Sequence, residues 1–514
     1  MKLFVLFLLR QRAFNAILAV AGVGALCLPP VCFAASPTKA PIKSTVKTPV
    51  AKPPVVKPTA KAPVLPYVAA LPSPTLESPS DKLSNGSVLI LRPDKLAPRV
   101  AISLLFKAGA ADETQPNAGW RRFLADAMLR GSLNAEGKAS ESKDVRRKAE
   151  ELGGSVGATV GDDQIEFWAI GDSATQDQLL DLVLQMALRP RLSDADIETA
   201  RERLLGRLDV ETNDVPTQAV NALRDRLYRN PEDAPIAYGL PGNGLEASVK
   251  GLEAAQLRRL HAAFFRPEKL VAAIAGDLHM PLLKARMESL PKGTESTEGL
   301  PTGMPNGLPP HLSPPPSERP PLIVKQYPSN MQVPIAWLFA GYTLPGASSD
   351  DAAALRVMSV ILGEMPRSRL ERRLMRVSLI PEADEIMVFQ ASSQWTPRRW
   401  AGELVVFAQT RSGDIEGAKN ALLDEITKMR DTPPTAPEME RAKNFLRGAW
   451  AVEREGLRER AFQTALATVL SGSDPKFSDV EWNTRIAKVS DEDVRRVANK
   501  YLKNYALTLI MPED

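Results

Sequence analysis

The sequence predicts an α+β protein of two homologous domains, each a largely antiparallel sheet with helices packed on one face. Three observations support this prediction. The chain has 514 residues, which is too long for a single hydrophobic core. A Pro- and Gly-rich tract at 292–321 reads as a linker between halves at 81–291 and 322–514, each of ordinary domain size. Three segments of the first half recur in the same order in the second, which indicates duplication.

The N-terminus has the pattern of a signal peptide. Residues 1–34 combine basic residues with an apolar run at 13–28, and they end in a small-x-small cleavage site at Ala34. Both cysteines, Cys27 and Cys32, lie inside this segment, so the mature chain would have no disulfide and no thiolate metal site. We therefore expect an exported, periplasmic protein. The alternative is an uncleaved signal that anchors the chain in the inner membrane.

A basic spacer follows the signal. Residues 35–80 are rich in Pro, Lys, Ala and Thr, a composition that cannot bury a core and favours an extended chain. We interpret it as a disordered, solvated spacer, and weak contact with an anionic membrane or cell wall is the alternative. Much of the net charge of +4 comes from this tract, so the folded part carries no field that would favour nucleic acid.

The repeated segments are a strand–turn–strand unit, a helix and a closing helix–strand unit. They lie at 88–109, 197–206 and 251–277 in the first half and at 322–342, 439–448 and 488–512 in the second. In the first half, a hairpin pattern at 153–170 and capping boxes at Ser173 and Ser193 lie between these units. Strands and helices thus come in blocks rather than in strict alternation, which favours α+β over a doubly wound sheet.

Several common kinds of site are absent from the sequence. There is no glycine-rich phosphate loop of the Walker or dinucleotide type and no G-x-S-x-G nucleophile elbow. The adjacent acids Asp162 and Asp163 fall at the predicted hairpin turn. We interpret them as turn residues rather than as an acid–base pair.

The folded part, about residues 82–514, resembles the insulinase/pitrilysin family of zinc metallopeptidases. In the first half the resembling stretches are LSNGSVLILRPDKLAPRVAISLLFKAGAADE, AGWRRFLADAMLRGS, ELGGSVGATVGDDQIEFWAI and ADIETARERLLGRL. In the second half they are GEMPRSRLERRLM and the closing helix–strand unit. The resemblance implies one family unit of two homologous α+β domains joined by a linker.

The residues that would hold zinc are replaced. Active members of the family use an inverted His-x-x-Glu-His motif on a helix, where the three positions share one face. Here the resemblance places Arg122 at the first His, Ala125 at the Glu and Asp126 at the second His, and a later ligand Glu falls at or next to Arg207. Arginine cannot ligate a cation and alanine cannot take a proton. The resemblance therefore implies degenerate catalytic and metal positions, with no zinc expected in this chain.

We find no substitute ligands elsewhere in the sequence. The only histidines, His261, His279 and His311, are not at ligand spacing, so we expect structural roles for them. A supporting acid of the family falls at Ala200. The Arg and Tyr that help active members hold substrate also look absent, because the altered stretch RVSLIPEADEI occupies 376–386.

A charged cluster is our hypothesis for what replaces the metal. Arg122 and Asp126 are four residues apart on one predicted helix and can pair, and Arg207 could reach the same carboxylate. Such a cluster would keep the two helices in register. The alternative is that these are independent residues on a solvated surface.

The resemblance implies a non-catalytic family member that is inactive on its own, although it belongs to a metalloendopeptidase family. Such a subunit pairs with a zinc-containing paralogous peptidase, as in processing-peptidase-like heterodimers, and binds extended peptides. One alternative is a solitary periplasmic peptide-binding or scaffold protein. Another is an active metalloendopeptidase with an atypical site, which would require ligands that the sequence does not offer.

Overall fold

The computed structural model describes seven stretches of the chain: 80–134, 137–229, 237–293, 322–326, 335–375, 387–472 and 479–512. The predicted signal peptide, nearly all of the spacer and most of the predicted linker lie outside the described residues. Among the helices in these stretches, none is long and apolar enough to cross a membrane.

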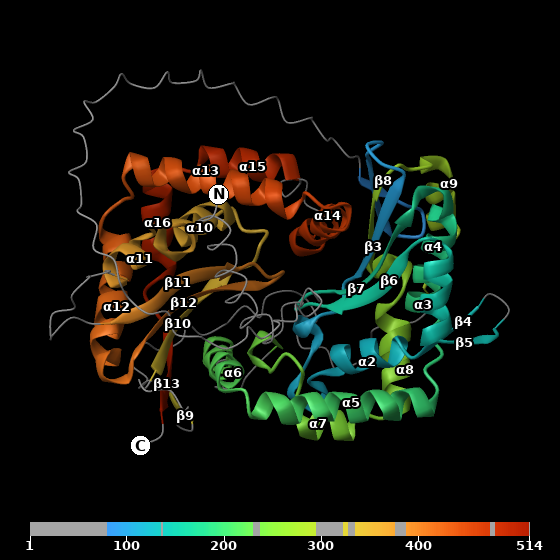
Figure 1. The fold of residues 1–514 in the computed structure, drawn as a ribbon, viewed down its shortest axis with the longest axis horizontal. Helices are drawn as coiled ribbons and strands as arrows, with labels where there is room; N and C mark the ends of the chain where they lie inside the picture. The colour runs from blue at the N-terminus through green and yellow to red at the C-terminus, as the bar shows by residue number, and fades with distance from the viewer. Residues whose placement is uncertain are drawn as a thin grey trace, which may run out of the picture. The chain divides into compact units, whose positions relative to one another are not determined.

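The first half forms a six-stranded sheet in the order β1-β2-β8-β3-β7-β6 (Figure 1). β2 and β8 are parallel, and all other neighbours are antiparallel. The strands are β1 (Ser80–Lys82), β2 (Val88–Pro93), β3 (Arg99–Phe106), β6 (Ser155–Val160), β7 (Ile165–Asp172) and β8 (Leu270–Gly276). β4 (Gly131–Leu133) and β5 (Ala139–Glu141) pair as a separate ribbon.

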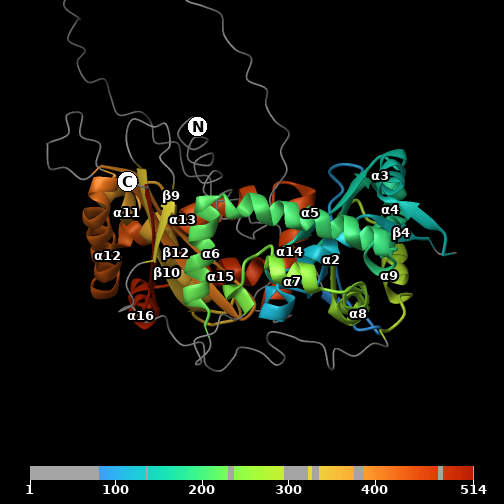
Figure 2. The same cartoon turned by 90° about the horizontal axis from the view of Figure 1, so that it is seen from below.

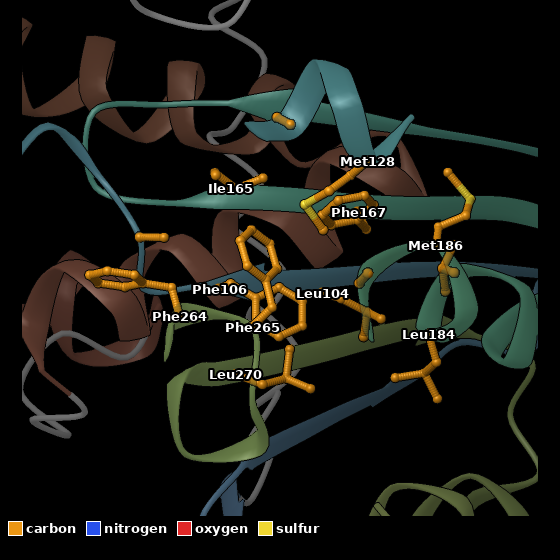
Figure 3. Close-up of a cluster of buried hydrophobic side chains, with 14 of the residues drawn as sticks. Leu104, Phe106, Met128, Ile165, Phe167, Leu184, Met186, Phe264, Phe265 and Leu270 are labelled. Atoms are coloured by element: carbon orange, nitrogen blue, oxygen red, sulfur yellow. The ribbon is translucent and has the colours of Figure 1, made fainter. Parts of the chain in front are cut away.

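Helices of the first half, with one exception, pack on one face of this sheet. The helices up to residue 293 are α2 (Trp120–Met128), α3 (Ser142–Glu151), α4 (Gln176–Leu188), α5 (Asp194–Thr212), α6 (Val215–Leu227), α7 (Glu246–Gly251), α8 (Ala254–Phe264) and α9 (Met280–Glu288). Figure 3 shows Phe106 of β3, Phe167 of β7 and Phe265 after α8 converging with Met128 of α2. The Phe106 and Phe265 ring centroids are 4.9 Å apart. The apolar faces of strands and helices thus close one continuous core.

The second half repeats this topology. Its five-stranded sheet has the order β11-β12-β10-β13-β9, and only β9 and β13 are parallel. The strands are β9 (Leu322–Gln326), β10 (Ile335–Pro345), β11 (Val388–Thr396), β12 (Ala401–Arg411) and β13 (Ala506–Pro512). Taken from the other edge, this order matches β2-β8-β3-β7-β6 strand for strand. The prediction of two homologous α+β domains is confirmed.

Helices of the second half, again with one exception, cover one face of its sheet. They are α10 (Ala352–Ser359), a π-helical segment η6 (Val360–Glu364), α11 (Arg369–Leu374), α12 (Ile415–Asp431), α13 (Ala436–Glu453), α14 (Leu457–Ser471), α15 (Asp479–Lys488) and α16 (Asp491–Tyr501). The core on this face includes Leu355 of α10, Leu422 of α12 and Val497 of α16, all fully buried.

The opposite face of each sheet is covered by a helix from the other half, which the sequence did not indicate. α6, from the first half, packs on the second sheet: Leu223 and Leu227 lie in one cluster with Phe339 of β10 and Phe407 of β12 (Figure 1). Gly341 of β10 allows this approach, because a Cβ there would lie 2.7 Å from the Leu227 side chain.

The reciprocal contact joins α14 to the first sheet. Ala461 and Ala465 of α14 pack against Ala101 of β3 and Ala273 of β8, where small side chains let the helix lie close to the strands. All seven residues of β8 are buried. Strands covered on both faces have nearly continuous apolar sequences rather than an alternating pattern, and the exchange of α6 and α14 is the reason here.

Candidate functional site

α2 carries the positions where the family motif would lie. Its N-cap, Gly119, has a φ of +90°, and a Cβ there would lie 2.6 Å from the backbone of the loop before α7, so this position requires glycine. Trp120 and Phe123 are fully buried and fix the helix in the first-half core. Arg122 and Asp126 are only partly buried.

α5 brings the later motif position to α2. The helix begins at a capping box in which the Asp196 backbone N–H donates to the Ser193 hydroxyl over 3.2 Å. α5 then lies along α2 (Figure 2). Arg207 of α5 forms an ion pair with Asp126, with the two side chains 43% and 18% exposed. This part of the predicted cluster is present and joins the two helices.

The predicted pair between Arg122 and Asp126 is not formed within the described part of the chain. No ion pair or hydrogen bond of the Arg122 guanidinium occurs there, and Arg122 Nε is buried without a partner. Burial, together with the positive charges of Arg121 and Arg207, lowers the pKa of Arg122 to about 10. Arg122 is therefore still a cation at neutral pH.

These residues do not fit a zinc ion. Zinc requires three or four nitrogen, sulfur or carboxylate ligands, and the motif positions supply one carboxylate that is already paired with a guanidinium. Ala125 is 2% exposed in the core, and Ala200 is fully buried there. Over the described stretches, no group of three or more His, Cys, Asp and Glu side chains is placed to hold a metal ion.

The two histidines within the described residues, His261 and His279, belong to no ligand arrangement. His261 Nε2 lies 3.0 Å from the Ala187 carbonyl oxygen, its ring stacks on Phe265, and burial lowers its pKa. His279 is the N-cap of α9. His311 and the altered stretch 376–386 lie outside the described residues.

Beside α2, the structure contains a chain of buried charges that sequence reasoning missed. We call it the inter-half ion network, and its members are Glu113, Arg121, Asp162, Arg224, Arg398 and Glu403. In the first half, Arg121 Nη1 lies 2.5 Å from Glu113 Oε2, and Arg121 Nη2 lies 3.8 Å from Asp162 Oδ1. Arg121 and Glu113 are 1% and 0% exposed.

The network then crosses to the second half. Arg398 Nε lies 2.7 Å from Asp162 Oδ2, and Arg398 Nη1 lies 3.0 Å from Glu403 Oε2. Arg224 of α6 reaches Glu403 from the first half, with Nη2 2.9 Å from Oε1. The Tyr228 hydroxyl accepts a hydrogen bond from Arg398 over 2.7 Å. Cations and anions alternate, so each buried charge has a partner of opposite sign.

The electrostatics of this network follow from burial and pairing. Burial alone would raise the pKa of Glu403, but Arg224 and Arg398 outweigh it and lower the pKa to about 2. Burial also opposes ionisation of Asp162, and Arg398 is the largest of the charges that lower its pKa. Both carboxylates are thus held ionised in the interior.

Asp163 is the exception beside the network. It accepts hydrogen bonds from the Tyr238 hydroxyl over 2.5 Å and from the Arg399 backbone N–H over 2.9 Å. Burial nevertheless raises its pKa to about 6. Asp162 and Asp163 do lie at the β6–β7 turn, as the sequence predicted, and they also make buried contacts with the second half that the sequence did not indicate.

Two family models match the chain. One, described as "Insulinase (Peptidase family M16)", matches residues 88–238. The other, "Peptidase M16 inactive domain", matches residues 251–446. The matched residues together cover more than half of the chain, and they include α2 and α5 in the first half.

Curated proteins similar to this chain include a subunit of the cytochrome b-c1 complex and zinc proteases. Subunit 1 of the bovine mitochondrial cytochrome b-c1 complex is 21% identical, with 85% of this chain and 86% of that protein covered. The zinc protease PqqE of Helicobacter pylori is 21% identical, with 80% and 87% covered. An uncharacterized zinc protease of Mycobacterium leprae is 23% identical over 33% of this chain, and that match spans only 36% of the relative's length.

Solved structures share the fold. A peptidase M16 inactive domain from Pseudomonas fluorescens has a TM-score of 0.71 at 17% identity, with 85% of this chain and 99% of that chain covered. A protease from Helicobacter pylori has a TM-score of 0.69 at 16% identity, with 85% and 100% covered. With two matching family models and the duplicated strand order of its two halves, the chain belongs to the M16 (insulinase) family of peptidases.

Proposed function

We propose that this protein is a non-catalytic M16 subunit that binds extended peptides and pairs with a zinc-containing paralogous peptidase. One observation carries the proposal: Arg207 pairs with Asp126, which is the only carboxylate among the positions that the family resemblance assigns to the motif on α2, Arg122, Ala125 and Asp126. A metallopeptidase needs a metal-bound water and a general base. Neither can be assembled from two guanidinium groups, a methyl group and a paired carboxylate.

Pairing is supported by the relatives. One relative that matches most of this chain is named as a subunit of a multi-subunit complex, and others are named as zinc proteases. The relatives thus include a protein named as a complex subunit and proteins named as zinc proteases, which are the two components that the proposed pair requires. The core around α2 is well packed. The helix is therefore folded as a structural element although its motif positions offer no metal ligands.

We further propose that the protein acts in the periplasm. The support is the signal-peptide pattern of residues 1–34, together with the absence of cysteine from the rest of the sequence. The basic spacer at 35–80 would then separate the folded part from the membrane or cell wall.

The test is affinity purification of the tagged, exported protein from its native host, followed by mass spectrometry and metal analysis. We expect a second chain of similar size and about one zinc per pair, as one catalytic site needs. A metal-free protein that elutes alone would favour a solitary peptide-binding protein. Zinc bound to this chain alone would overturn the proposal.

A further inference from the structure

Three guanidinium groups gather at α2, and one has no counter-ion. Arg121 pairs with Glu113, and Arg207 pairs with Asp126. Arg122 has neither an ion pair nor a hydrogen bond to any group in the described stretches, and its Nε is buried without a partner. One positive charge is therefore in excess at the position of the first family histidine.

The charges around Arg122 do not neutralise it. Arg121 and Arg207 repel it, and both lower its pKa. Asp162 and Glu113 act in the opposite direction, but both are already engaged in the inter-half ion network. A partly buried cation without hydrogen-bond partners is unfavourable, so an anion that supplies oxygen acceptors here would gain free energy on binding.

We infer that Arg122, with Arg207 beside it, binds a carboxylate group of a peptide. A guanidinium is a planar fork of N–H donors that matches the two oxygens of a carboxylate, and such charge-assisted bonds are stronger than neutral ones. The inference rests on the proposed function, which makes peptide the ligand. A zinc ion would polarise a neutral peptide carbonyl for attack, whereas a guanidinium selects a charged carboxylate and leaves the chain uncut.

The carboxylate can come from the C-terminus of a peptide or from an acidic side chain. Three fluorescein-labelled peptides of twelve residues and otherwise equal sequence distinguish these sources by fluorescence polarisation. The first has a free C-terminal carboxylate and no acidic residue, the second has an amidated C-terminus and one central Glu, and the third is amidated with Gln in place of that Glu. We expect the first or the second to bind the wild-type protein about tenfold more tightly than the third at low salt, with the difference shrinking as salt is raised.

Variants assign this preference to the site. Arg122→Gln should abolish the tenfold preference, because the carboxylate-bearing peptide should then bind no more tightly than the third peptide. Arg122→Lys should keep part of the preference, because an ammonium attracts a carboxylate but lacks the fork. Arg259→Gln is the matched control: it removes one positive charge from an exposed position on α8 and should keep the full preference.

The outcomes separate this inference from the proposed function. If all three peptides bind the wild-type protein equally, the carboxylate site is wrong while peptide binding stands. If none binds, both the carboxylate site and peptide binding are wrong, although recovery of a zinc-containing partner would still support pairing. If Arg122→Gln does not fold, the wild-type and Arg122→Lys series decide, and an undiminished preference in Arg122→Lys would contradict a guanidinium-specific site.

Discussion

Two neighbouring regions contain the same types of charged side chain, arginines and carboxylates, but pair them differently. In the inter-half ion network, arginines and carboxylates alternate, and Arg398 and Glu403 are 1% and 0% exposed. At the motif positions of α2, Arg207 is 43% exposed and Arg122 has no counter-ion in the described residues. Buried charges that are paired with opposite charges hold the two halves together. A charge without a counter-ion, such as that of Arg122, is available to bind a ligand. This difference sets the expected sizes of mutational effects.

The largest effect is expected in the network. Arg398→Met should lower the free energy of unfolding by about 3–5 kcal/mol, because it removes the cation that links the two carboxylates. Among the described ion pairs, Asp162 then keeps only the 3.8 Å contact with Arg121, and Glu403 keeps only Arg224. Urea unfolding followed by circular dichroism measures this, with Arg259→Met, at an exposed position, as the matched control. A loss below about 1 kcal/mol would mean that the network stabilises the fold no more than a surface ion pair does.

A pH-dependent effect of intermediate size is expected at Asp163. Its pKa is about 6 in the folded protein and about 3.9 when unfolded, so its contribution to stability is present below pH 4 and is lost as pH rises through 6. The loss is about 3 kcal/mol. Asp163→Asn should remove this fall, which unfolding curves at about pH 4.5, 5, 6 and 7 would detect.

The experiment at Asp163 requires a restricted pH range and a control variant. Glu403 acts in the opposite direction: its pKa of about 2 means that its contribution is present above about pH 4.5 and lost as pH falls toward 2. The curves are therefore compared only above pH 4. Asp209→Asn, at an exposed position on α5, should leave the pH dependence unchanged. Equal pH profiles for wild type and Asp163→Asn would show that Asp163 does not titrate in this range.

A small effect is expected at the α2–α5 contact. Arg207→Gln should cost less than about 1 kcal/mol, because its pair with Asp126 is close to solvent and weakened by it. Arg122→Gln should be neutral or slightly stabilising, since it removes an unpartnered cation. Thermal unfolding measures both variants. If Arg207→Gln lowered stability as much as Arg398→Met does, the ion pair at α2 would be as important for folding as the inter-half ion network.

The smallest effect is expected from rebuilding the metal motif. Arg122→His, Ala125→Glu, Asp126→His and Arg207→Glu together restore the family residues on α2 and α5. We expect little or no zinc-dependent cleavage of a fluorogenic peptide, because the stretch at 376–386 also departs from the pattern of active members. Robust cleavage abolished by a chelator would show that only the first-half residues separate this chain from a peptidase.

The sequence predicted the duplication because it depends on local patterns, whereas the motif positions on α2 were assigned from the resemblance to the family. Periodicity and turns locate strands and helices, and the spacing from Arg122 to Asp126 is one helical turn. The network could not be predicted in this way. Arg398 and Asp162 are 236 residues apart in sequence, and only the packing of the two halves brings them together. The apolar sequence of β8 indicates burial on both faces, but nothing in it identifies α14 as the cover.

The exchange of α6 and α14 has a consequence for the origin and the durability of the molecule. Two copies of a single ancestral half that swapped this helix would have formed a domain-swapped dimer, with each subunit completing the other's sheet. Joining the copies in one chain would make that association permanent. We therefore expect that a protease cut in the linker at 292–321 leaves both fragments associated, and that either half expressed alone aggregates through its uncovered sheet face.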